Sequence, residues 1–312
     1  MNLKKLPKHL LFLIILFSIS SFDKNRKYKG AKVLIDIGDS LTAGVGGEGT
    51  TMSNVTLKLL KENWIVKNRG VGGENSLTIG ARQGGIPMYI KDTITIPANG
   101  SSIEIPNGIY SSYNNKNIYP LIQGEGGLNP CYINGIECTL KRNSKTEKYS
   151  IKRNRRSSES YTTKPKTNIV TQLSFETKGI ATIFIGQNGG YENPEDLLNQ
   201  INQFVKHKGD KNIIIITSHG NGNSKIVKPI KKKYGKKLID LKKYMSEKAI
   251  YDAIEFELLP NNGEYPTNED LERMDKNQTP KTLLIDGIHF NSIGYELLGR
   301  LRYEKGKELR YW

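Results

Sequence analysis

The chain has 312 residues, of which 47 are Lys or Arg and 31 are Asp or Glu, so its formal net charge is +16. A basic surface attracts polyanions, but the sequence holds no nucleic-acid-binding motif; an anionic cell-surface polymer is favoured as a partner and nucleic acid is not expected. The two cysteines and four histidines have no metal-ligand spacing, so a metal site is not expected either.

Much of the basic excess lies in residues 141–166, which include the run KRNRR at 152–156. A solvated, lysine-rich hairpin would show the same composition, and this alternative stays open.

Residues 1–22 have the pattern of a secretory leader. Three lysines, at positions 4, 5 and 8, precede an apolar run at 10–19. We therefore expect a secreted or cell-envelope protein, with contact to the membrane only if the leader remains as an uncleaved N-terminal anchor.

Beyond the leader, apolar segments alternate with segments of helical spacing. Strands are predicted at 32–37, 64–68, 180–185, 211–217 and 237–240, and helices at 51–62, 194–206, 225–234 and 292–303. The runs at 180–185 and 213–216 are apolar without alternation, as strands buried on both faces are. The pattern predicts an α/β fold, a flavodoxin-like three-layer sandwich.

Residues 77–167 interrupt this alternation. The segments 92–97, 102–106 and 149–153 alternate polar and β-branched residues between clusters of Gly, Pro and Asn, which predicts an antiparallel, β-rich insertion. It begins directly after the glycine-rich segment at 68–75, so it is expected near any site formed at the carboxyl ends of the strands, as a possible substrate-recognition subdomain. A purely structural addition is the alternative.

A hairpin is predicted inside the insertion. Asn134-Gly135 is a strong type I′ turn signal, and with these two residues as the loop Cys131 lies directly opposite Cys138. A disulfide between them is plausible in an exported protein, but the sequence does not decide it.

Ser40 follows the apolar run at 33–37, and a serine at the carboxyl end of such a strand is placed where α/β proteins gather catalytic groups. Near the other end of the chain, Asp286 and His289 are three residues apart, so one loop could bring both side chains together. A serine becomes a strong nucleophile when a histidine oriented by a carboxylate takes its proton. His219, after the fourth predicted strand, is the rival base.

Four separated motifs follow one another along the chain: GDSLTAG around Ser40, NRGVGGEN at 68–75, GQNG at 186–189 and Asp286-x-x-His289. With these motifs the chain resembles the SGNH subgroup of the GDSL hydrolases, in two segments, 31–76 and 168–312, that would form the hydrolase domain. The third motif of that family usually reads Gly-x-Asn-Asp, and Gly189 stands here in place of the Asp. The contribution of that acidic neighbour must therefore be absent or supplied elsewhere.

The resemblance implies a serine esterase with a triad of Ser40, His289 and Asp286. It also implies an oxyanion hole made by the backbone N–H groups of Ser40 and Gly73 and the side-chain amide of Asn188, and it requires no cofactor. Further residues near these motifs could contact a substrate: Asp39, Asn75, Arg82 and Gln83.

The expected activity is removal of O-acetyl groups from a carbohydrate or cell-surface glycan through an acyl-enzyme. Three alternatives remain at this stage: a lipase or lysophospholipase, an acetyltransferase with the same triad, and a glycan-binding protein on a vestigial hydrolase fold. The sequence does not show the acyl pocket that would separate them.

Overall fold

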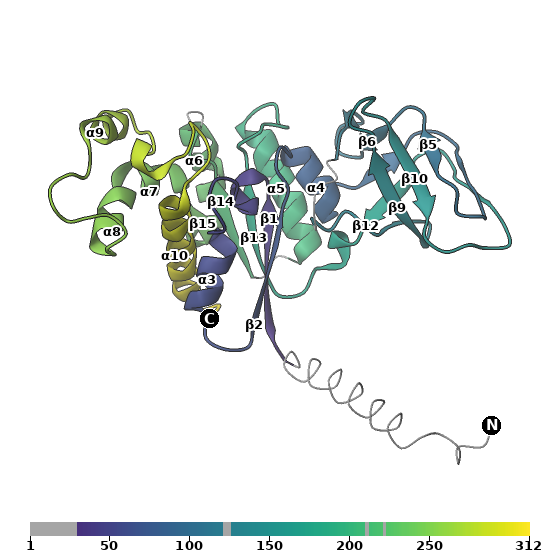
Figure 1. Cartoon of the computed structure of the whole chain (residues 1–312). Helices are drawn as coiled ribbons and strands as arrows, with labels where there is room; N and C mark the ends of the chain where they lie inside the picture. The colour runs from purple at the N-terminus through teal and green to yellow at the C-terminus, as the bar shows by residue number, and fades with distance from the viewer. Residues whose placement is uncertain (1–29, 121–125, 210–211, 221–222) are drawn as a thin grey trace, which may run out of the picture.

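The structure is a computed structural model that describes residues 30–120, 126–209, 212–220 and 223–312. The expected leader at 1–22 lies outside the described residues. Figure 1 shows an α/β body in the middle, a β-rich lobe on one side of it and a group of short helices on the other.

The body is built on five parallel strands. They are β1 (Lys32–Gly38), β2 (Trp64–Gly70), β13 (Ile180–Ile185), β14 (Ile213–Thr217) and β15 (Leu238–Ile239), in the spatial order β15-β14-β13-β1-β2. Counted along the chain, this is the 2-1-3-4-5 order of a doubly wound sheet, in which ligands bind at the carboxyl ends of the strands where the order reverses. Here the reversal falls between β1 and β13.

All five strands predicted from the sequence are present, and β15 is shorter than its predicted range of 237–240. The prediction at 211–217 corresponds to β14, and residue 211 lies outside the described residues.

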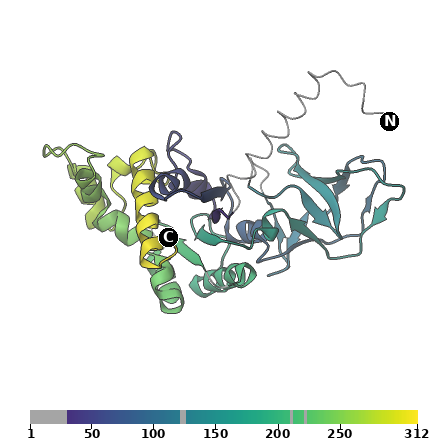
Figure 2. The same ribbon diagram turned by 90° about the horizontal axis from the view of Figure 1, so that it is seen from below.

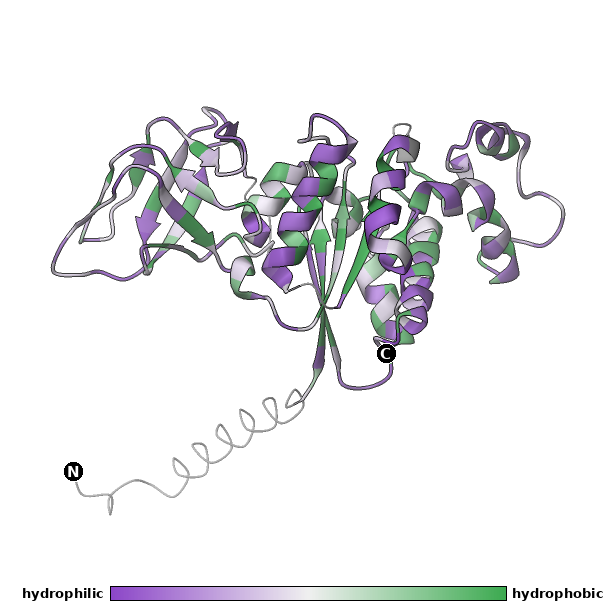
Figure 3. Ribbon diagram, turned by 180° about the vertical axis from the view of Figure 1, so that it is seen from behind, coloured by the Kyte–Doolittle hydropathy of each residue, from purple (hydrophilic) through white to green (hydrophobic). Residues whose placement is uncertain are grey.

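Helices cover both faces of this sheet. One face packs against α3 (Met52–Leu59), α7 (Leu241–Glu247), α8 (Ala249–Glu255) and α10 (Ser292–Glu308), the other against α4 (Ser76–Gln83), α5 (Pro194–Lys208) and α6 (Asn223–Tyr234). Each face of the sheet has its own hydrophobic core, and consecutive residues of β14 belong to opposite cores. Ile215 lies in the core that includes α4, α5 and α6, and Ile216 in the core that includes α3, α7, α8 and α10. Figure 3 shows the strands as largely hydrophobic and the outer helix surfaces as hydrophilic.

The helix ends follow from local capping. α5 begins where the Asn193 side chain accepts a hydrogen bond from Asp196 N, with Pro194 in the first turn, and it ends at Gly209 with φ 91°. α3 ends three residues before its predicted limit, because Leu60 is already extended (ψ 146°). α10 continues beyond its predicted end to Glu308.

A buried ion pair ties two of these helices to β1. Asp36 of β1 and Arg302 of α10 are both 0% exposed and in contact. Ser53 of α3 donates to Asp36 at 2.6 Å, and Arg302 Nε donates to Thr56 Oγ1 at 2.9 Å. Because charges in the interior need such partners, this network fixes α3 and α10 against the strand that leads to Ser40.

The β-rich lobe runs from β3 (Met88–Ile90) to β12 (Thr167–Thr171). Because β12 pairs with β3 and β8, the lobe extends past the predicted end of the insertion at residue 167, and this boundary is corrected. Its antiparallel sheet has the order β5-β10-β9-β8-β12-β3-β6-β7, and a separate pair joins β4 (Thr95–Ile96) to β11 (Tyr161–Thr162). The other strands are β5 (Ile103–Ile105), β6 (Ile109–Ser111), β7 (Asn117–Ile118), β8 (Cys131–Ile133), β9 (Ile136–Arg142) and β10 (Tyr149–Arg153). β4, β5 and β10 fall within the three strand segments predicted from the sequence.

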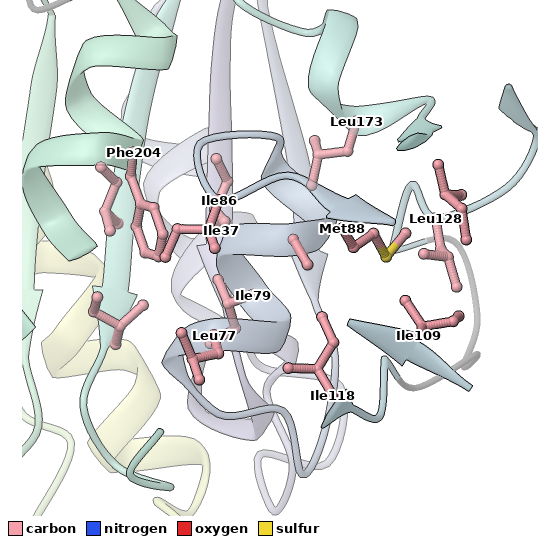
Figure 4. Packing of buried hydrophobic residues seen from close by; sticks show 14 of the residues in the cluster. Ile37, Leu77, Ile79, Ile86, Met88, Ile109, Ile118, Leu128, Leu173 and Phe204 are labelled. Carbon is pink, nitrogen blue, oxygen red and sulfur yellow. The ribbon is translucent and has the colours of Figure 1, made fainter. Parts of the chain in front are cut away.

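The predicted start of the insertion at residue 77 is corrected by the structure. Residues 76–83 form α4, capped by the reciprocal Asn75 and Thr78 hydrogen bonds, and its Leu77 and Ile79 are buried. The first segment after the second strand is therefore a helix of the α/β body. Figure 4 shows how its residues pack with Phe204 on one side and with Met88 and Ile109 of the lobe on the other.

The predicted hairpin is confirmed, including its register. Asn134 and Gly135 both have positive φ, 46° and 80°, as a type I′ turn requires, and Cys131 pairs with Cys138. The structure holds both cysteines as free, buried thiols. Burial raises the pKa of Cys131 to about 12 and that of Cys138 to about 11.

The lobe contacts the segment between β13 and α5 and the first turn of α5. Lys116 pairs with Glu192 at 3.0 Å, and Tyr113 Oη donates to Asp196 Oδ1 at 2.6 Å. Figure 2 shows the lobe from below, extending to one side of the body. Because Asn188 lies in this same segment, the lobe is anchored a few residues from the candidate site.

Within the described residues, no helix has the length and apolar character needed to cross a membrane.

Candidate active site

Ser40 lies at a tight turn between β1 and α2 (Ser40–Ala43). Asp39 caps α2, its Oδ1 accepting a hydrogen bond from Leu41 N at 3.0 Å. A Cβ at Gly38 would overlap Thr42 Oγ1 and the carbonyl of Phe184, so this turn requires glycine. The strand therefore delivers Ser40 to the carboxyl edge of the sheet, where it is 7% exposed.

Asp286 and His289 reach this serine from the loop before α10. His289 Nε2 lies 2.9 Å from Ser40 Oγ, and His289 Nδ1 lies 2.8 Å from Asp286 Oδ2. The second oxygen of Asp286 accepts the backbone N–H groups of Ile288 and His289, both at 2.7 Å. The structure thus brings the three residues expected as a triad into one hydrogen-bonded chain.

The charge state of Asp286 suits this arrangement. The hydrogen bond from His289, followed by the two backbone N–H groups, lowers the pKa of Asp286 to about 2. An ionised Asp286 accepts from Nδ1–H, which leaves the lone pair of Nε2 directed at the hydroxyl of Ser40.

His219 does not contact Ser40 in this arrangement. Its Nε2 lies 2.8 Å from the carbonyl of Ile288 and its Nδ1 lies 2.9 Å from Thr279 Oγ1. Burial lowers the pKa of His219 to about 4, so the ring is neutral at pH 7 and donates from Nε2. His219 supports the loop that carries His289, and the serine contact belongs to His289.

The residues expected to form an oxyanion hole converge on Ser40 from two further strand ends. Asn188, after β13, donates from Nδ2 to the carbonyl of Glu74 at 3.0 Å and lies 3.4 Å from Asp39 Oδ2. These contacts join it to the neighbours of Gly73 and Ser40. Gly73 is exposed and has φ 81°, a conformation that favours glycine. The three positions therefore follow the carboxyl ends of three adjacent strands, β2, β1 and β13.

Gly189 occupies the position where the GDSL hydrolases that this chain resembles have an acidic residue. Its backbone carbonyl binds the first residue of α4. The Gly189 carbonyl accepts hydrogen bonds from both the N–H and the hydroxyl of Ser76, each at 3.0 Å. The start of α4 is thereby tied to the segment that carries Asn188.

Asp39 is the acidic side chain adjoining the serine, and it is 1% exposed. Desolvation raises its pKa from 3.8 to about 6, against the hydrogen bond from Leu41 that lowers it. Asp39 was expected as a possible substrate contact, but its carboxylate is buried. The carboxylate instead caps α2 at Leu41 N and accepts from Asn188 Nδ2.

We expect Asp39→Asn to remove part of the pH dependence of stability. A carboxyl whose pKa is raised on folding holds its proton more tightly in the folded chain. The wild type should therefore lose stability as pH rises from about 4 to 6, by on the order of 2–3 kcal/mol. Urea unfolding at pH 4 and pH 8 should show a smaller loss for the variant, because Asn is neutral at both.

Asp240→Asn is the matched control, since Asp240 caps α7 in the same way but is only half-buried. Equal losses in the wild type and in Asp39→Asn would contradict a buried, proton-holding Asp39.

Arg82 and Gln83, expected as possible substrate contacts, are buried in the structure, and this expectation is corrected. Arg82 is 0% exposed and pairs with Glu74 at 2.6 Å, and Gln83, 3% exposed, donates to the carbonyl of Phe204. All eight residues of α4 are buried, so these two side chains make internal contacts and present no exposed face to a substrate. Asn75, the remaining candidate, is half-buried and uses its side-chain oxygen to cap α4.

The Arg82 guanidinium links the loops around the site. It donates to the carbonyls of Gly38, Arg69 and Gly126 at 3.1, 2.5 and 2.7 Å, in addition to Glu74. Sequence reasoning missed this arrangement because its acceptors come from separate segments. The sequence around Arg82 contains no pattern that predicts these three carbonyl acceptors.

Two comparisons with known proteins give no match: neither a protein-family model nor a curated protein corresponds to this sequence. Among solved structures, the crystal structure of the lipase/acylhydrolase from Enterococcus faecalis aligns with 89% of this chain and 96% of its own, at 15% identity and a TM-score of 0.43. A likeness this loose carries neither fold nor activity to the present chain. Among the described residues, no group of three or more His, Cys, Asp or Glu side chains could hold a metal ion.

Proposed function

We propose that this chain is a serine esterase of the SGNH type, with Ser40 as nucleophile. The observation that carries the proposal is the continuous Ser40, His289 and Asp286 hydrogen-bonded chain at 2.9 and 2.8 Å. The 2-1-3-4-5 parallel sheet with helices on both faces supports a flavodoxin-like SGNH hydrolase fold.

The geometry supports the following reaction. His289 Nε2 takes the proton of Ser40 as Oγ attacks the ester carbonyl carbon, and Asp286 stabilises the imidazolium that forms. The negative charge on the carbonyl oxygen is met by the N–H groups of Ser40 and Gly73 and by the Asn188 amide, each worth about 3 kcal/mol. His289 then protonates the departing alcohol. Water, deprotonated by the same imidazole, releases the acid from Ser40.

We propose O-acetyl groups on a carbohydrate or cell-surface glycan as the substrate. Support comes from the β-rich lobe anchored on the Asn188 segment and from the leader pattern at 1–22, which favours an extracytoplasmic location. A lipase or lysophospholipase is the alternative within the same chemistry.

The deciding experiment is a panel of nitrophenyl esters from acetyl to octanoyl, together with acetylated sugars, assayed with purified protein. Preference for acetyl esters and release of acetate from sugars are expected. Preference for octanoyl would favour the lipase alternative, and no turnover of any ester would favour the vestigial hydrolase.

We further propose that the lobe binds an anionic surface polymer. A pocket of about 440 Å³ there is lined by Lys152, Arg153 and Arg156 and by no acidic residue among the described ones. Arg153 is 8% exposed, and within the described chain its Nε has no hydrogen-bond partner. A buried, incompletely satisfied guanidinium beside two exposed cations favours an oxyanion ligand.

Lys152→Gln with Arg156→Gln should elute from an anionic polysaccharide column at lower salt than the wild type, because the contact is electrostatic and screened by ions. The control Lys231→Gln with Lys232→Gln removes the same charge from exposed positions of α6. Equal shifts for the two pairs would show a general charge effect and no site.

A further inference from the structure

A second pocket, of about 350 Å³, shares its walls with the two loops of the candidate active site. It is lined by Gln187, His219, Gly220, Arg273, Gln278, Thr279, Gly287 and Ile288. Gln187 immediately precedes Asn188, and Gly287 and Ile288 lie between Asp286 and His289. The pocket therefore adjoins the two segments that carry Asn188 and His289, and its lining consists of their sequence neighbours.

The lining is polar and carries one positive charge. Arg273 of α9 (Asn268–Asp275) is its only charged side chain among the described residues, since both ring nitrogens of neutral His219 are already used. Arg273 Nε donates to the carbonyl of Thr279 at 2.7 Å, which fixes the side chain. Within the described chain no acid pairs with its guanidinium, whose remaining N–H groups can take a ligand.

The neighbouring amides extend this donor set. Gln187 Oε1 accepts the hydroxyl of Ser218 at 2.6 Å, so its NH₂ group is left as a donor beside Gly220. Gln278 is held by its backbone N–H, which donates to the Arg273 carbonyl at 2.8 Å. Of the lining side chains only Ile288 is apolar, and burying a long acyl chain here would desolvate Arg273 without replacing its hydrogen bonds.

We propose that this pocket binds the alcohol portion of the substrate and that Arg273 recognises an oxyanion, a carboxylate or a phosphate, on an acidic sugar. The proposal rests on the esterase function proposed above. A guanidinium forms paired, charge-assisted hydrogen bonds with either group, and Gln187 and Gln278 suit sugar hydroxyls. The site would thus select acidic glycan esters over neutral esters of the same acyl group.

The test compares mono-acetylated methyl glucoside, methyl glucuronide and glucose 6-phosphate as substrates, and measures their binding to the inactive Ser40→Ala protein by calorimetry. The wild type should favour one of the two acidic sugars over the glucoside in kcat/KM, and which one it favours separates carboxylate from phosphate. Arg273→Gln should reduce this preference about tenfold, mainly through KM. Raised salt should weaken it in the wild type.

Arg273→Lys separates recognition from support of the loop. Lysine keeps the charge but cannot reproduce the Nε bond to Thr279, so it should retain part of the preference if Arg273 binds the substrate. Arg155→Gln, an exposed arginine of the lobe, is the control for net charge.

The two proposals fail in different ways. Turnover with an equal preference in the wild type and Arg273→Gln overturns the subsite and leaves the esterase. Without ester turnover, Arg273-dependent binding of the acidic sugar overturns the esterase and retains the pocket. Absence of both turnover and binding overturns both.

Discussion

Replacing Ser40 with alanine is expected to reduce ester turnover by about four to six orders of magnitude, because the members of a Ser-His-Asp unit act together and alanine provides no nucleophile. The fold should be retained. Ser40 Oγ contacts His289 at the edge of the sheet, while the turn itself is held by the Asp39 cap and by Gly38. The measurements are kcat for the best ester of the panel and the urea midpoint.

Asn188→Ala gives a graded comparison at the same site. Loss of one oxyanion donor should lower kcat about a hundredfold or more, and an effect confined to KM would instead assign Asn188 to substrate binding. The matched control for Ser40→Ala is Ser144→Ala, at an exposed serine in a turn of the lobe, which should keep normal turnover. Near-normal turnover by folded Ser40→Ala would rule out Ser40 as the nucleophile.

The parts of the fold that were predictable are those set by local sequence. The run at 180–185 has no alternation of polar and apolar residues, with Thr182 its one polar member, because both faces of β13 are covered. Asn134-Gly135 fixes the hairpin register through its positive φ angles. α4 was missed because the polar and β-branched residues that follow Asn75 also suit a strand. The helix is stabilised instead by the capping box of Asn75 and Thr78 and by the burial of Ile79.

The candidate site divides in the same way. Asp286 and His289 were recognisable because they are near neighbours in sequence and one loop suffices to join them. The support from His219 was not recognisable, since it depends on Thr279 and Ile288, which are 60 and 69 residues further along the chain. Arg273 gave no signal either, because a charged residue on an amphipathic helix normally faces solvent.

Arg82→Met is expected to lower the free energy of unfolding by about 3–5 kcal/mol, because it leaves the carboxylate of Glu74 buried without its cation. Both side chains are 0% exposed. The guanidinium also joins the carbonyl of Gly38, which precedes the Ser40 turn, to those of Arg69 and Gly126. Its loss should therefore lower kcat as well, through the position of Ser40. Urea unfolding and ester kinetics on the same preparation measure both effects.

Removing the partner charge tests whether the pair is the cause. Glu74→Gln combined with Arg82→Met should recover part of the lost stability, since no unpaired charge then remains in the interior. Arg142→Met is the control, because its partner Glu147 is 63% exposed and such pairs are worth less than about 1 kcal/mol. If Arg82→Met instead left stability unchanged and raised KM alone, Arg82 would contact the substrate.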